Sequence, residues 1–161
     1  MTRVSEDTPR FELSEISLAD DLDALARDIN ACAWDEGNQM SVYDAASLEL
    51  YLNHQDTLLV TCHRVEATGR TLAGFASGRF QIKPYDGERW LYVDEVDVCA
   101  DQRQKGAGAT LMQKFIAIAE YHGCEEVWLG TEVDNDAANA LYRSLDPDDE
   151  AEVVGYTWET D

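Results

Sequence analysis

A short polar loop with two glycines contains the residues best suited to chemistry. It runs from Arg103 to Ala109 and reads Arg-Gln-Lys-Gly-Ala-Gly-Ala. The small residues would let a ligand approach the backbone closely, and Arg103 and Lys105 supply two cations. A helix that begins here would point its free N–H groups and the positive end of its dipole out of the loop. These are the properties of a phosphate or pyrophosphate cradle.

Other ligand-binding motifs are excluded or disfavoured. The loop lacks both the Gly-Lys-Ser/Thr ending of a Walker loop and the third glycine of a dinucleotide fingerprint. A plain strand-to-helix turn with no ligand stays open as the alternative. The four cysteines are scattered without the spacing of a metal site, so we expect no metal and reduced thiols: Cys32, Cys62, Cys99 and Cys124.

The strand before the loop is the second candidate for chemistry. Residues 90–99 alternate and are rich in aromatic and β-branched types, as in a half-buried strand. Strand alternation places Glu95, Asp97 and Cys99 on one face, while Asp94 lies on the other with Val96 and Val98. After Gly108 the apolar residues recur every three or four positions, which predicts a helix: Leu111, Met112, Phe115, Ile116, Ile118 and Ala119.

The elements around this unit follow from periodicity and turn residues. Before it, the sequence predicts a strand over 11–16, a helix capped by Ser17, a second helix from Asp44, and strands over 57–65 and 71–82. Gly74 and Gly78 indicate a bulge or a close backbone approach. After it come a strand over 125–133, a short helix over 137–145 and a last strand over 153–158.

This order predicts one domain over residues 1–161, with its core at about 10–160. The fold class is α/β (α+β), with a mixed, mostly antiparallel central sheet and helices on both faces. No apolar run approaches the ~20 residues of a membrane helix, and the N-terminus has no hydrophobic segment. We therefore expect a cytoplasmic protein that does not bind membranes.

The charge is strongly acidic. Thirty-three acids face 12 bases, which gives a net charge of −21, and the acids are spread through the chain. Only Lys83, Lys105 and Lys114 are lysines. A diffuse acid excess suits high salt, which screens self-repulsion, so we hypothesise a halophilic source. Nucleic acid is a poor partner because no basic face is present, whereas a cationic small substrate is electrostatically plausible.

The sequence also resembles a known family, the GNAT superfamily of acetyl-CoA-dependent N-acetyltransferases, over residues 10–160. The family's loop pattern is Gln/Arg-x-x-Gly-x-Gly/Ala, which Arg103, Gly106 and Gly108 fill. A downstream segment, Asn135-x-x-Ala138-x-x-Leu141-Tyr142, matches as well. One departure is that the family commonly continues Tyr-x-x-x-Gly-Phe, whereas this chain continues through Arg143 to Asp146 and Pro147.

The resemblance implies roles for individual residues. The strand backbone before the loop would pair with the pantetheine arm of acetyl-CoA: Val96, Asp97 and Val98. The loop amides would hold the pyrophosphate: Arg103, Gln104, Lys105, Gly106, Ala107, Gly108 and Ala109. Asn135 would touch the cofactor, with Asn139 as a further candidate, and Tyr142 would be the general acid for the departing thiolate.

Within the superfamily, the nearest resemblance is to aminoglycoside 3-N-acetyltransferases. It rests on Glu95-Val96-Asp97-Val98 before the loop and on the acids that lead into Ala140-Leu141-Tyr142. Three of these acids could hold a polycationic acceptor, or could simply be a solvated rim: Glu132, Asp134 and Asp136.

Acetyl transfer to an amine needs a base, a donor for the carbonyl oxygen and an acid for the leaving thiolate. Glu95 is the preferred base, directly or through a water, because burial beside apolar neighbours can raise its pKa. A merely solvated or substrate-binding carboxylate is the alternative, and a packing role is the alternative for Tyr142. Direct transfer is expected, because the family usually transfers directly and no His lies near Cys99 in sequence.

The predicted function is transfer of an acetyl group from acetyl-CoA to a primary amine of a small cationic acceptor. Three alternatives stay open: a non-catalytic acyl-CoA-binding regulatory module, a peptide or protein N-acetyltransferase, and an acidic interaction domain that binds no nucleotide. A homodimer is also left open.

Overall fold

A mixed sheet with the strand order β1-β2-β3-β4-β5 organises the fold. Its first four strands are β1 (Arg10–Glu15), β2 (Thr57–Glu66), β3 (Gly69–Ile82) and β4 (Arg89–Val98). Each of these is antiparallel to the next. The fifth, β5 (Glu126–Trp128), runs parallel to β4. The predicted mixed, mostly antiparallel sheet is confirmed.

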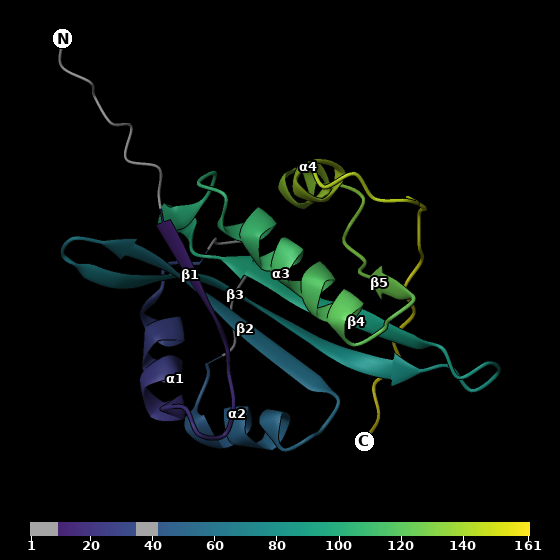
Figure 1. The fold of residues 1–161 in the computed structure, drawn as a ribbon, viewed down its shortest axis with the longest axis horizontal. Helices are drawn as coiled ribbons and strands as arrows, with labels where there is room; N and C mark the ends of the chain where they lie inside the picture. Colours follow the sequence, from purple (N-terminus) through teal and green to yellow (C-terminus); the bar gives the residue numbers. More distant parts are fainter. Residues whose placement is uncertain (1–9, 35–41) are drawn as a thin grey trace, which may run out of the picture. The chain divides into compact units, whose positions relative to one another are not determined.

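The computed structural model describes residues 10–34 and 42–161. It divides into two compact units, Met1–Trp128 and Leu129–Asp161, which are described separately. The sheet lies in the first unit, and its helices cover both faces (Figure 1). Helices α1 (Leu22–Ala31) and α2 (Ala45–Leu52) cover one face, and α3 (Ala107–Tyr121) covers the other.

The two faces of the sheet bury two apolar layers. On the α1 and α2 side, Ile29 and Leu48 pack with Leu59 and Phe75 of the sheet. On the other side α3 packs on β2, β3 and β4, and its Phe115 is fully buried. Each face thus takes alternate residues of the same strands, as the period of two requires.

One extra residue in β4 reverses this alternation. Ser77 pairs with Glu95 but Gly78 pairs with Val93, so Asp94 is an additional residue on the β4 side. Val93 therefore faces α3, whereas Glu95, Asp97 and Cys99 lie on the α1 and α2 face, with Cys99 in that core. The predicted shared face of these three residues is confirmed, but Asp94 is a bulge residue rather than a regular member of the opposite face.

Both predicted glycine positions accompany bulges. Gly78 lies opposite the Asp94 bulge, and a Cβ there would lie 2.5 Å from the Tyr92 carbonyl oxygen and 2.9 Å from the Phe115 ring. At Gly74 a Cβ would collide with the Asp97 carbonyl. The predicted close backbone approach is confirmed at both.

Three predicted elements differ from the structure. Asp21, not Ser17, caps α1 by accepting from the Ala24 N–H, because Ser17 is engaged in a turn with Asp20. The strand predicted over 125–133 is only β5, since its pairing with β4 ends at Tyr92 and Trp128. Residues 153–158 form no strand in the described chain; their apolar side chains are exposed, and alternation without a paired neighbour does not make a strand.

The second unit, Leu129–Asp161, contains the helix α4 (Asp136–Arg143). Asn135 caps it by accepting a hydrogen bond from the Ala138 N–H at 3.2 Å. Arg143 forms an ion pair with Glu150, which ties the segment after the helix back to it. The predicted short helix is confirmed, one residue earlier at its start than the predicted 137–145.

Candidate active site

The loop between β4 and α3 forms the predicted strand-loop-helix junction. The 3-10 turn η1 (Ala100–Gln102) follows β4, and α3 begins after Gly106. Gln104 (φ 57°) and Gly106 (φ 96°) adopt left-handed backbone conformations, which glycine tolerates and most side chains do not. The loop conformation therefore depends on Gly106.

The first turn of α3 offers backbone donors. Gly106 provides no capping side chain to this helix, and the first bond in the helix is from the Thr110 N–H to the Gly106 carbonyl, at 3.0 Å. The N–H groups of residues 107–109 precede that bond and point out of the helix end. Donors at a helix N-terminus fit a phosphate group.

The two cations of the loop, Arg103 and Lys105, directly precede this helix end in the chain. The Lys105 ammonium donates to the Asp101 carbonyl at 3.1 Å, which folds it back along the loop. Arg103 and Gln104 are exposed, whereas Ala107 and Gly108 are buried. The loop residues that sequence reasoning predicted are therefore brought together as one surface with small residues underneath.

The edge of β4 is the second part of the site. Pairing with β5 covers only Trp90 to Tyr92, so β4 continues to Val98 after β5 has ended. The backbone at Val96, Asp97 and Val98 lies on this continuation, directly before the loop. A bulge bends its strand, and the Asp94 bulge lies where the two strands part. The geometry fits an extended ligand beside β4.

Glu95 lies on the α1 and α2 face, in a polar group. Its Oε2 is 3.5 Å from the Tyr43 hydroxyl. Partial burial, together with the charge of Asp97, raises the pKa of the Glu95 carboxyl above its ordinary value. Hydrogen bonds from Tyr43 and Ser77 act in the opposite direction. The result is a carboxylate that accepts a proton more readily than a free glutamate.

Tyr43 is a site residue that sequence reasoning missed. Burial and the charge of Glu95 raise its pKa to about 12, so its hydroxyl stays protonated and can donate to the carboxylate. Asn30 of α1 holds the Tyr43 backbone: its amide donates to the Tyr43 carbonyl at 2.8 Å and accepts from the Tyr43 N–H at 2.9 Å. The ring also packs edge-on against Phe75. No local pattern marks this residue, because its partners are distant in sequence.

The predicted residues of the second unit are grouped around α4. Asn139 donates its amide to the carbonyls of Glu132, Val133 and Asn135 at 2.9 to 3.3 Å, so it braces the turn before the helix. Asn135 caps the helix through its side-chain oxygen. Both amides thus have structural roles within the unit, and Tyr142 is half-buried on the same helix.

The predicted acidic rim is also local to this unit. Glu132, Asp134 and Asp136 are exposed on the turn and first residue of α4. Asp136 lies in the first helical turn, where a negative charge is favourable. Asp136 can therefore stabilise the N-terminus of α4 without any ligand.

These groups can support acyl transfer in physical terms. A carboxylate with a raised pKa lies on β4, backbone donors lie at the α3 N-terminus, and an extended strand edge connects them within the first unit. Among described residues, no three His, Cys, Asp or Glu side chains gather as metal ligands, and no helix is long and apolar enough to cross a membrane.

The fold is similar to that of solved acetyltransferases. An aminoglycoside acetyltransferase from an uncultured soil metagenomic sample, solved with sisomicin, matches with a TM-score of 0.78 and 18% identity, covering 94% of this chain and 97% of that one. A ribosomal-protein-alanine N-acetyltransferase from Brucella melitensis biovar Abortus 2308 matches with a TM-score of 0.67 and 19% identity, covering 93% of this chain and 99% of that one. A transcriptional regulator from Bacillus halodurans C-125 matches with a TM-score of 0.71 and 15% identity, covering 92% of this chain and 100% of that one. Identities this low show the shared fold alone.

The sequence itself identifies the family. The family model described as "Acetyltransferase (GNAT) family" matches residues 23–146, more than half of the chain. No curated protein matches at a significant level. The chain therefore belongs to the GNAT family and is an acetyl-CoA-dependent N-acetyltransferase.

Proposed function

We propose that this enzyme acetylates a primary amine of a small cationic acceptor by direct transfer, with Glu95 as the general base. The observation that carries the proposal is the Glu95 carboxylate, whose pKa is raised by burial and by Asp97 and which lies beside the Tyr43 hydroxyl. An amine must lose a proton to attack, and a base with a raised pKa takes that proton more effectively at neutral pH.

The residues assigned to acetyl-CoA keep the roles that the family resemblance implies. When bound, acetyl-CoA supplies an activated acetyl thioester. The backbone of Val96, Asp97 and Val98 would pair with its pantetheine arm, and the amides of residues 103–109 would hold its pyrophosphate. Support comes from the strand edge beyond Tyr92 and from the uncapped start of α3.

Two further residues complete the proposed machinery. A backbone N–H near Val96 would donate to the carbonyl oxygen as negative charge develops there. Tyr142 would donate the proton to the departing thiolate. Asn135 and Asn139 brace the helix that carries Tyr142, so we assign them to positioning as well as to the cofactor contact that the resemblance implies.

A cationic acceptor is favoured by charge. Three carboxylates, Asp94, Glu95 and Asp97, lie within four consecutive residues of β4, and the chain carries a net charge of −21. Glu132, Asp134 and Asp136 are the further acids that the family resemblance offers for holding a cationic acceptor. The sisomicin-bound structural neighbour acts on an aminoglycoside, a class with several amines, which makes that class the first to test. A peptide N-terminus is the second candidate, because another neighbour is a ribosomal-protein-alanine N-acetyltransferase.

The test is thiol release from acetyl-CoA over aminoglycosides, polyamines and peptide N-termini in high salt. We expect turnover with a polyamine or an aminoglycoside. Turnover with peptides alone would overturn the small-acceptor assignment. Acetyl-CoA binding without thiol release over the whole panel would favour a regulatory module instead.

The base is tested with Glu95→Gln and a matched carboxylate control. Glu95→Gln should lower kcat at neutral pH by about 10²-fold, the usual contribution of general base catalysis. The loss should shrink as pH rises, because more of the acceptor is then already neutral. Glu88→Gln, on the exposed β3–β4 turn, should leave the rate unchanged. A ratio that does not vary with pH would contradict the base role.

A further inference from the structure

Two cysteines from distant parts of the chain lie together beside the loop of residues 103–109, which is called the cradle loop below. Cys32 is the C-cap of α1, and Cys99 directly follows β4. Both thiols are directed at the same acceptor, the Leu72 carbonyl, with Sγ–O distances of 3.9 and 3.3 Å. The backbones next to them are also joined, because the Ala100 N–H donates to the Ala33 carbonyl at 2.8 Å.

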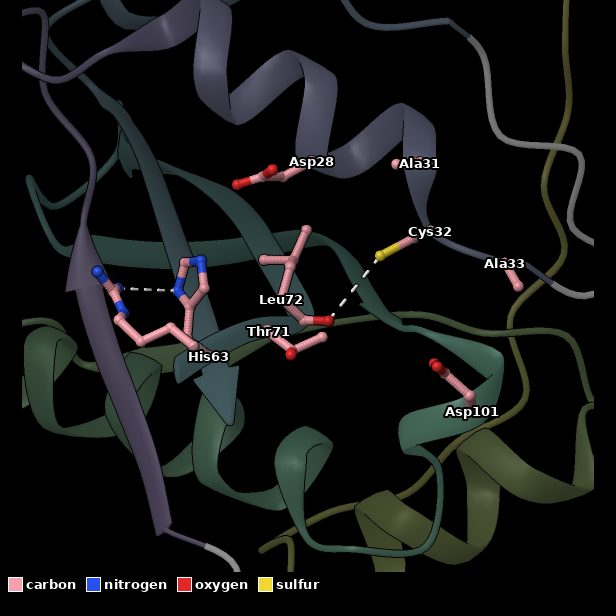
Figure 2. A pocket seen from close by; sticks show the side chains of 9 residues that line it. Asp28, Ala31, Cys32, Ala33, His63, Thr71, Leu72 and Asp101 are labelled. Atoms are coloured by element: carbon pink, nitrogen blue, oxygen red, sulfur yellow. Dashed lines mark hydrogen bonds between the residues drawn. The ribbon is translucent and has the colours of Figure 1, made fainter. Parts of the chain in front are cut away.

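The two thiols differ in access. Cys32 lines a pocket of about 460 Å³, with Asp28, His63 and Asp101 among the other lining residues. Figure 2 shows its sulfur at the pocket wall with the hydrogen bond to Leu72. Cys99 is fully buried. A small molecule in the pocket could therefore reach the Cys32 sulfur, whereas Cys99 is buried and does not line the pocket.

The two side chains influence each other's acidity. The Cys99 thiol lowers the pKa of the Cys32 thiol, because it can donate to the Cys32 sulfur when that sulfur is ionised, against the opposing effects of burial and of the Asp101 and Asp28 carboxylates. The nearby Cys32 sulfur, together with burial, raises the pKa of Cys99. The thiolate is the reactive form of cysteine, so the accessible thiol is also the one that ionises more readily.

We propose that Cys32 and Cys99 form a dithiol oxidation site for small hydroperoxides, with Cys32 as the attacking thiol and Cys99 as the resolving thiol. The Cys32 sulfur attacks the peroxide, the O–O bond breaks, and an alcohol or water leaves, so that Cys32 becomes a sulfenic acid. The Cys99 sulfur then attacks the Cys32 sulfur, the S–O bond breaks, and hydroxide leaves as water with the Cys99 proton. The peroxide is reduced and the two thiols are oxidised to one disulfide.

The disulfide would add a covalent bond between two elements that the reduced protein joins by hydrogen bonds and by packing in one core. It would tie the C-terminal end of α1 to the end of β4, immediately before η1 and the cradle loop. This site lies on the first unit alone, and its chemistry does not depend on the acceptor of the acetyl group.

The experiment treats the reduced full-length protein with one equivalent of hydrogen peroxide. Intact mass should fall by two hydrogen atoms, and non-reducing peptide mapping should give a Cys32–Cys99 linkage. Cys32→Ser should abolish the linkage. Cys99→Ser should stop at the sulfenic acid, which dimedone traps on Cys32; Cys99→Ala is the second variant if the buried serine disrupts folding.

The control is Cys124→Ser, because the half-buried Cys124 follows the C-terminal end of α3, which covers the other face of the sheet from α1. It should oxidise like the parent protein. The proposal is overturned if the parent keeps its mass, if the linkage involves Cys62 or Cys124, or if only intermolecular disulfides form. It is equally overturned if both Cys99 variants fold but leave Cys32 unmodified by dimedone.

Discussion

Tyr43 and Glu95 illustrate how one hydroxyl can adjust the pKa of the carboxylate that we propose as the base. The hydroxyl lies 3.5 Å from Glu95 Oε2 and stabilises the charged form of the acid. Burial and Asp97 act in the opposite direction and prevail, so the Glu95 pKa is raised on balance. The chemistry of this position therefore depends on a residue 52 positions away in sequence.

Removing that hydroxyl should raise the Glu95 pKa further. In Tyr43→Phe we expect the acidic limb of the kcat/KM profile to move to higher pH, because the ionised base loses a stabilising hydrogen bond. The measurement is a pH profile at saturating acetyl-CoA.

Tyr51→Phe is the matched control for this prediction. The Tyr51 hydroxyl lies 2.8 Å from the Gly78 carbonyl oxygen and 3.1 Å from that of Leu58. Its loss should lower stability by about 1 kcal/mol and leave the acidic limb in place. Equal pH profiles for Tyr43→Phe and the parent would remove Tyr43 from the site.

At the scale of elements, the loop and α3 were predictable because local sequence determines them. Gly106 supplies the left-handed residue, and the apolar period of α3 follows at once. The shared face of Glu95 and Asp97 was predictable for the same reason. The Asp94 bulge was not predictable, because an exposed acid within an acidic chain alters no apolar pattern.

Long-range pairing explains the other differences. Tyr43 reaches Glu95 through Asn30 and Phe75, which no spacing in the sequence reveals. Residues 153–158 alternate well enough to predict a strand, yet a strand also requires a neighbour to accept its hydrogen bonds. Alternation of apolar and polar residues is compatible with a strand, but the strand forms only where the segment pairs with a neighbouring strand.

The cradle loop leads to a prediction about cofactor binding. Gly106→Val places a β-branched residue at φ 96°, which costs about 1–3 kcal/mol of backbone strain, and should abolish acetyl-CoA binding in calorimetry. Gly87→Val is the matched control: it has φ 77° and open space around it on the β3–β4 turn. It should lose comparable stability but keep its affinity. Unchanged acetyl-CoA affinity in Gly106→Val would remove the cradle assignment.

For the whole molecule, the dominant property is the net charge of −21. Self-repulsion of this size destabilises the compact state, and salt weakens it as the Debye length falls from ~10 Å at 0.1 M to ~3 Å at 1 M. The ion pairs among described residues that could lose strength are largely exposed, such as Arg70–Glu12 and Arg79–Asp94, and exposed pairs contribute little.

We therefore expect the Tm to rise steadily with KCl from low to multimolar concentration. The measurement is thermal unfolding by circular dichroism. Sucrose at equal osmolality is the comparison, because it acts by exclusion from the surface and does not screen charge. A Tm that is equal at all KCl concentrations would contradict the halophilic hypothesis.

The extra residue in β4 has a consequence for how this protein tolerates insertions and deletions. Deleting Asp94 would leave every other side chain of β4 on its present face of the sheet, because Val93 and Glu95 already pair with consecutive residues of β3. Its deletion would yield a regular strand with both apolar layers intact. Since bulges bend strands, the straightened β4 could run on beside β5. The space proposed for acetyl-CoA would then depend on the number of residues in β4. Deletion of the single codon for Asp94 would close that space without changing any other residue.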